Sequence, residues 1–236
     1  MPEKRIPTGT GVLEELLGGG YEVDVVTTIY GPAGSGKTNL VLLAAISIAK
    51  QGKKVIYIDT EGGFSIARLK QLTSNSKKIL SNILFLKPAK FSEQKKAFEK
   101  LKEVVNKREI GLIIVDTIAM LYRLELGKSE DVYEVNRALG KQIAYLTEIA
   151  RKKNIPVLIT NQVYSNFDER NKINMVGGDI IKYGSKCLIE LQVTPNNKRR
   201  AILKKHRSLP EEKEVMFEII EKGLKHVKGG RSFKLF

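Results

Sequence analysis

The stretch GPAGSGKT at residues 31–38 decides how the rest of the sequence is interpreted. It fits the pattern G-x-x-x-x-G-K-[ST] in full and has the context that the pattern requires. A β-type apolar run, VDVVTTIY (23–30), comes before it, and a helical run, NLVLLAAISIAKQG (39–52), follows. Such a loop surrounds phosphates with backbone N–H groups at a helix N-terminus. The stretch therefore predicts a nucleotide site formed by Gly31, Pro32, Ala33, Gly34, Ser35, Gly36, Lys37 and Thr38.

Acidic residues at the ends of two later apolar runs are candidates for the chemistry at the phosphates. GLIIVD (111–116) predicts a strand buried on both faces, and it ends in Asp116. We expect Thr38 and Asp116 to hold the Mg²⁺ of bound ATP, because the carboxyl edge of a parallel sheet meets the ligand. YIDTEGG (57–63) adds Asp59 and Glu61 at the same edge. Either carboxylate could orient the attacking water, and spacing alone does not choose between them.

The composition predicts one globular domain over residues 1–236, with residues 1–20 as a short lead-in. The chain is 42% hydrophobic and 28% charged, which is typical of globular proteins. No apolar run approaches the roughly 18–20 residues that a membrane helix needs. The first residues, MPEKRIPTGTG, lack the apolar centre of a signal peptide. The single cysteine, Cys187, excludes an intrachain disulfide, and a cytoplasmic location fits these features.

The order of the apolar runs predicts an α/β fold. Strand patterns at 54–59, 111–116 and 155–162 alternate with helical patterns, the longest at about 130–153. This alternation predicts a mostly parallel central sheet with helices on both faces. The last β-type runs have no helices between them, so we expect antiparallel strands that extend one edge of the sheet. They are KCLIELQV (186–193), RRAILKKH (199–206) and VMFEII (215–220).

The net charge of +15 points to a polyanionic partner. Residues 182–236 hold 14 Lys and Arg against 6 Asp and Glu, so the excess is concentrated near the C-terminus. A positive field of this kind attracts nucleic acid, the commonest large polyanion, although it could also serve solubility. Charge alone does not decide between these two explanations.

Four motifs together resemble the ATPase core of the RecA/RadA recombinase family. They are, in order, LLGGGYEVDVVTTIYGPAGSGKT (16–38), YIDTEGGFSIARL (57–69), GLIIVDTIAMLYR (111–123) and PVLITNQV (156–163). The resemblance implies a RecA-like P-loop NTPase that uses ATP and Mg²⁺. With little sequence before Thr8, the chain is similar to the short archaeal paralogues associated with recombinational repair, so we expect no separate N-terminal DNA-binding domain.

The resemblance also assigns roles to single residues. It makes Glu61 the catalytic carboxylate, Arg68 the residue that stacks on adenine, and Gln162 the sensor of the γ-phosphate. Gln162 ends a buried strand, and a polar segment with paired glycines follows it at residues 163–179. We expect this segment to change order when the sensor loses its phosphate.

DNA contacts are expected in three regions. In recombinases the segment after Asp116, from about 123 to 136 here, is the first DNA-binding loop, and residues 163–179 correspond to the second. Both carry acids as well as bases, so KRRAILKKHR (198–207) is expected to supply much of the affinity. The candidate DNA-binding residues are Arg123, Lys128, Arg170, Lys172, Lys198, Arg199, Arg200, Lys204, Lys205 and Arg207.

Two functions follow from these patterns. In the first, the protein binds ATP and DNA, with single strands favoured, and acts in homologous recombination and DNA repair; hydrolysis is weak and serves as a switch. In the second, it is a nucleotide-gated mediator that contacts a RadA-type recombinase. RadA completes its ATP site across subunits with an Asp-x-Pro cap, and this chain has Lys205, His206 and Arg207 there. We therefore expect slow hydrolysis and a homodimer or weak oligomer, and a ring-forming motor is disfavoured.

Overall fold

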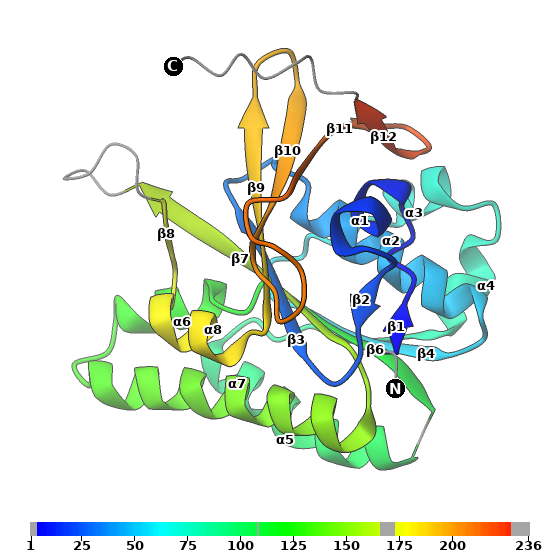
Figure 1. Cartoon of the computed structure of the whole chain (residues 1–236). Helices are drawn as coiled ribbons and strands as arrows, with labels where there is room; N and C mark the ends of the chain where they lie inside the picture. Colours follow the sequence, from blue (N-terminus) through cyan, green and yellow to red (C-terminus); the bar gives the residue numbers. More distant parts are fainter. Residues whose placement is uncertain (1–3, 108, 166–172, 228–236) are drawn as a thin grey trace, which may run out of the picture.

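The computed structural model describes residues 4–107, 109–165 and 173–227. In this part of the chain a ten-stranded sheet carries helices on both faces (Figure 1). Along the main path the strands are β12 (Gly223–Val227), β11 (Glu214–Ile220), β10 (Lys198–Lys205), β9 (Cys187–Thr194), β3 (Val26–Gly31), β7 (Val157–Ser165), β6 (Ile110–Asp116), β4 (Lys54–Asp59) and β5 (Ile83–Leu86). The tenth strand, β8 (Ile173–Met175), pairs with β7, and a separate ladder joins β1 (Arg5–Ile6) to β2 (Tyr21–Glu22).

The sheet is parallel from β5 to β9 and antiparallel from β9 to β12. This confirms the predicted architecture, including the antiparallel strands at one edge. The strand that carries Gln162 pairs in parallel with the strand that ends in Asp116. The carboxyl ends of β3, β4, β6 and β7 therefore meet at one edge of the sheet.

Two groups of helices cover the two faces (Figure 1). On the first face lie α1 (Gly11–Leu17), α2 (Lys37–Lys50), α3 (Ile66–Leu72) and α4 (Ser76–Ser81). On the second face lie α5 (Phe91–Lys107), α6 (Met120–Leu126), α7 (Val132–Lys153) and α8 (Gly178–Gly184). Strand β6 shows why both layers are needed: Ile114 joins the first core and Ile113 the second, and both are fully buried. A strand apolar on both faces can be stable only between two layers.

The α6–α7 region corrects the expected loop at residues 123–136. Arg123 lies in the last turn of α6, and α7 already begins at Val132, so the connection is short. The Asp131 side chain caps α7 by accepting a hydrogen bond from the backbone N–H of Glu134 at 2.9 Å. Tyr122 is buried and donates a hydrogen bond to Asn136 at 2.5 Å, which ties the two helices together.

The segment after Gln162 also differs from the expected polar loop. Strand β7 continues to Ser165 and pairs antiparallel with β8, so part of the segment is a β-hairpin. Met175 is buried with Tyr30 and Leu188, and Val163 packs against them. These apolar side chains pack the base of the hairpin against the sheet. The polar composition of the segment did not predict this packing. Within the described ranges, no helix has the length and apolar character to cross a membrane.

Candidate nucleotide site

The loop at residues 31–38 connects β3 to α2 in a backbone conformation that requires glycine. Gly34 and Gly36 have φ of 72° and 104°, in the region that L side chains rarely adopt. A Cβ at Gly36 would lie 3.1 Å from the Ile219 side chain, so β11 closes one side of the loop. The loop leads directly into the first turn of α2, where backbone N–H groups have no helical acceptor. The predicted context of the loop, strand before and helix after, is therefore present.

Lys37 and Thr38 occupy the first turn of α2, as a phosphate site requires. The Lys37 side chain is buried, and its Nζ donates hydrogen bonds of 2.9 Å to the carbonyls of Gly31 and Pro32. Burial lowers the pKa of Lys37, while the carboxylates of Glu61 and Asp116 act in the opposite direction. The ammonium is thus held beside the loop by two backbone carbonyls.

Asp116 is positioned by two buried hydroxyl groups that the sequence reasoning did not single out. Tyr57 donates a hydrogen bond to Asp116 Oδ2 at 2.8 Å, and Thr160 donates to Asp116 Oδ1. Burial, followed by the charge of Asp116, raises the pKa of Tyr57. Tyr57 on β4 and Thr160 on β7 face the same side of the sheet as Asp116, as the register of the pairs β4–β6 and β6–β7 shows. Strand alternation, applied to neighbouring strands, is the signal that could have found them.

The structure separates the roles of Asp59 and Glu61. Asp59 is buried, and its two oxygens accept hydrogen bonds from the backbone N–H groups of Gly63 (3.0 Å) and Phe64 (3.2 Å). It therefore closes the turn after β4. Glu61 is exposed at the same edge of the sheet, so its carboxylate is the one accessible to a substrate water.

Glu61 and Gln162 contact each other directly. Gln162 Nε2 donates to Glu61 Oε1 at 2.8 Å, and Thr117 Oγ1 donates to the same oxygen at 2.9 Å. The first of these bonds is accessible to solvent. The structure thus brings together the candidate catalytic carboxylate, the candidate sensor and the residue after Asp116.

Arg68 connects α3 to the β11–β12 turn. Its Nε donates to Asn39 Oδ1 at 2.7 Å, and its Nη groups donate to the carbonyls of Ile220 (2.9 Å) and Glu221 (2.8 Å). These hydrogen bonds use the edge of the guanidinium, whereas stacking on adenine would use its face. The adenine role therefore stays a prediction.

The basic run at residues 198–207 does not form the single patch that its sequence suggests. Successive β10 side chains point to opposite faces of the sheet, and most of the cations already have partners. Arg200 lies 3.3 Å from a Glu214 carboxylate oxygen, and Lys204 lies 2.5 Å from one of Glu212. Lys205 Nζ donates to the Lys182 and Ser185 carbonyls at 2.8 Å.

Arg207 is held by acids at the start of the chain. Its Nε lies 2.8 Å from Glu22, whose side chain is almost fully buried, and its Nη2 lies 3.0 Å from Asp24. Lys198 has no ion-pair partner within the described part of the chain. Of the remaining candidates, Arg123 and Lys128 are exposed, and Arg170 and Lys172 lie outside the described residues.

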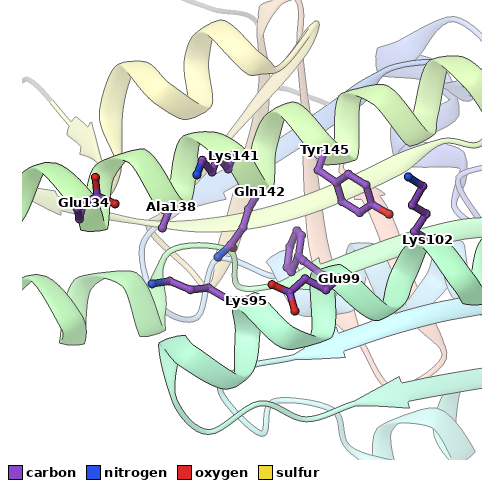
Figure 2. A pocket seen from close by; sticks show the side chains of 9 residues that line it. Lys95, Glu99, Lys102, Glu134, Ala138, Lys141, Gln142 and Tyr145 are labelled. Atoms are coloured by element: carbon purple, nitrogen blue, oxygen red, sulfur yellow. The ribbon is translucent and has the colours of Figure 1, made fainter.

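A separate groove of about 560 Å³ lies between α5 and α7, on the second face of the sheet. Figure 2 shows Lys95, Glu99 and Gln142 pointing into the space between these helices. The loop at residues 31–38 leads into α2 on the first face, so the groove and the candidate nucleotide site are distinct.

Comparisons with known proteins agree with this arrangement. The Rad51 family model matches residues 4–227. The DNA repair and recombination protein RadB of Methanobrevibacter smithii is 43% identical over 226 residues, which cover 93% of this chain and 95% of that protein. The protein of the same name from Methanococcus maripaludis strain C7 is 45% identical over 215 residues, covering 90% and 97%.

A solved structure extends the similarity to three dimensions. The crystal structure of the RadB recombinase matches with a TM-score of 0.80 and 38% sequence identity, over 94% of this chain and 100% of that one. The predicted RecA-like fold is thereby confirmed. The chain belongs to the Rad51 family, in its RadB group.

Proposed function

We propose that this protein binds ATP and DNA and acts in homologous recombination and DNA repair, with slow ATP hydrolysis as a conformational switch. The observation that carries the proposal is the 2.8 Å hydrogen bond between Gln162 and Glu61 beside the phosphate loop. Gln162 lies on β7, which continues without a break into the β7–β8 hairpin. A change at the sensor can therefore reach the hairpin through a single strand.

The residues present suit ATP and Mg²⁺. The loop at 31–38 and Lys37 would hold the phosphates, and Thr38 and Asp116 would hold the metal, directly or through water. Among the described residues no group of three or more His, Cys, Asp or Glu side chains could hold a metal ion. A Mg²⁺ ion held by Thr38 and Asp116 would take the rest of its coordination from phosphate and water. Bound Mg·ATP would supply the transferable γ-phosphoryl group and the metal charge that stabilises it.

The switch depends on competition for the Gln162 amide. In the structure the amide donates to Glu61. With a γ-phosphate within reach, the amide can donate to it instead, because the phosphate carries more negative charge than the Glu61 carboxylate and the bond to Glu61 is exposed to solvent. Glu61, released from Gln162, is then free to accept a proton from the attacking water. RadA carries its acidic cap at the positions that Lys205 and Arg207 occupy here. Both residues already bind groups of this chain, so we expect no such cap and slow hydrolysis.

DNA contact is proposed for the surface around the α6–α7 connection and the β7–β8 hairpin, together with Lys198. Arg123 and Lys128 are exposed there, and so are Tyr133 (74%) and Tyr164 (52%). Burial, followed by the nearby Tyr164 on β7, raises the pKa of Tyr122 on α6. The hairpin and the α6–α7 region are therefore close to each other. Exposed aromatic rings beside cations are typical of single-strand binding sites.

The salt dependence of DNA binding tests this proposal. Each phosphate neutralised on a single strand contributes about −0.7 to the slope of log K against log salt. Replacing Arg123, Lys128 and Lys198 by alanine should reduce that slope by about 2. The matched control replaces Lys50, Lys77 and Lys78, three exposed lysines on α2 and α4. The control should keep the wild-type slope.

A flat slope in the wild-type protein would contradict DNA binding and favour the alternative function. In that alternative, the protein is a nucleotide-gated mediator that acts through contact with a RadA-type recombinase. Solution mass measured with ATP and with ADP would show whether the chain forms the expected homodimer or weak oligomer.

A further inference from the structure

Arg199 lies on the first face of the sheet, which α2 and the loop at residues 31–38 cover, unlike the cations next to it. It pairs with Val193 on β9 and Phe217 on β11. Every second residue of a strand points to the same face, so Arg199 shares its face with Ala201 and Leu203. Ala201, Leu203 and Phe217 are fully buried in the core that α2 closes. Arg200 lies on the opposite side, where it contacts Gln192 and Glu214. Two consecutive arginines therefore serve different faces of β10.

The guanidinium of Arg199 reaches the phosphate loop within the same chain. Nη2 lies 3.4 Å from the Gly34 carbonyl oxygen, with the geometry of a hydrogen bond. Nη1 donates to Asn197 Oδ1 at 2.7 Å, in the β9–β10 turn, where Asn196 and Asn197 both have positive φ. Nε is buried and has no hydrogen-bond partner. The β9–β10 turn thus holds a cation over the loop.

The charge of Arg199 is not compensated by an acid. Among the described residues it has no ion-pair partner, whereas Arg200, Lys204 and Arg207 each have at least one. The buried N–H without a partner is costly in isolation. An anion bound in the loop at residues 31–38 would be attracted by the uncompensated charge of Arg199, because the guanidinium contacts a carbonyl of the same loop.

We infer that Arg199 is a second cation of the nucleotide site, acting with Lys37 from within the same subunit. It stabilises the bound polyphosphate by its charge, and the loop by its contact with Gly34. This inference rests on the proposed ATP binding. It also removes Arg199 from the set of expected DNA contacts. Of the two consecutive arginines, Arg199 would then contact the bound nucleotide, while Arg200 lies on the opposite face of the sheet.

The test measures affinity for fluorescent ATP and ADP analogues in the full chain, with Mg²⁺, for three variants. Arg199→Gln should weaken ATP binding about tenfold, the effect of losing one interaction with a charged group. It should weaken ADP binding less, since ADP carries less negative charge. Arg199→Lys should recover most of the ATP affinity. Arg200→Gln, the neighbouring control on the opposite face, should change neither affinity.

Three results would overturn the inference while leaving ATP binding established. Arg199→Gln could bind ATP as the wild type does. Arg199→Lys could be as weak as Arg199→Gln, which would show that the charge is not what matters. Arg199→Gln could also lose DNA affinity and salt slope without nucleotide present, which would return the residue to the DNA surface. By contrast, a wild-type protein that does not bind the ATP analogue would contradict the proposed function itself.

Discussion

Replacing Gln162 by alanine removes the amide that links Glu61 to β7. The existing bond is 2.8 Å long and accessible to solvent, so it contributes about 1 kcal/mol. A bond from the same amide to a γ-phosphate oxygen would contribute about 1.5–3 kcal/mol, because phosphate carries more negative charge than the Glu61 carboxylate and would be held by the loop rather than exposed to solvent. The difference, about 0.5–2 kcal/mol, is the free energy by which ATP can bias the hairpin. The middle of this range corresponds to roughly a tenfold change in the population of an open state.

Limited proteolysis measures this bias, since Arg170 and Lys172 provide trypsin sites between β7 and β8. When opening is fast, the cleavage rate follows the population of the open form. The wild-type protein should be cut about tenfold more slowly with a non-hydrolysable ATP analogue than with ADP. Gln162→Ala should still bind both nucleotides but should be cut at equal rates. Gln51→Ala, at the exposed C-terminus of α2, is the control and should behave as wild type. A Gln162→Ala protein that keeps the tenfold difference would refute the sensor role.

Three further changes test the residues around the loop. Lys37→Ala should weaken Mg·ATP binding about 100-fold or more by removing the buried ammonium, measured with a fluorescent analogue; near wild-type binding would contradict the site assignment. Asp59→Ala should lower the free energy of unfolding in urea by about 1–3 kcal/mol, because two backbone N–H groups lose their acceptor, whereas Asp59→Asn should cost less. Burial raises the pKa of Cys187 to about 12, so at pH 8 the thiol should react with Ellman's reagent only after unfolding; rapid reaction of the folded protein would show that the site is open.

The parts of the fold that the sequence predicted are those with local signals. The order of strands and helices follows from apolar periodicity, and the phosphate loop from the spacing of Gly31, Gly36 and Lys37. The placement of Asp116 beside Gln162 follows from the shared carboxyl edge of neighbouring parallel strands.

Features that depend on distant contacts could not be predicted in this way. The positions of Asp59 and Glu61 after the strand do not tell their roles apart. The hydrogen bonds that Asp59 accepts from the backbone N–H groups of Gly63 and Phe64 do so in the folded protein. The hairpin after Gln162 forms because Met175 and Val163 find Tyr30 and Leu188, which are far away in sequence.

The basic run at residues 198–207 looked uniform because the sequence shows charge but not the partners of each charge. Glu22 and Asp24 lie more than 180 residues from Arg207 and bind it in the folded protein. The sequence does predict a strand here, and successive side chains of a strand point to opposite faces. The opposite orientation of adjacent cations could therefore have been predicted.

In the proposed switch, a γ-phosphate held by the loop competes with Glu61 for the Gln162 amide. A crystal structure of the protein with Mg²⁺ and a non-hydrolysable ATP analogue is the most direct test. We expect the phosphates within residues 31–38 and Gln162 Nε2 within hydrogen-bond distance of a γ-phosphate oxygen. Phosphates bound elsewhere, or a Gln162 amide that still donates to Glu61 beside an occupied loop, would contradict it.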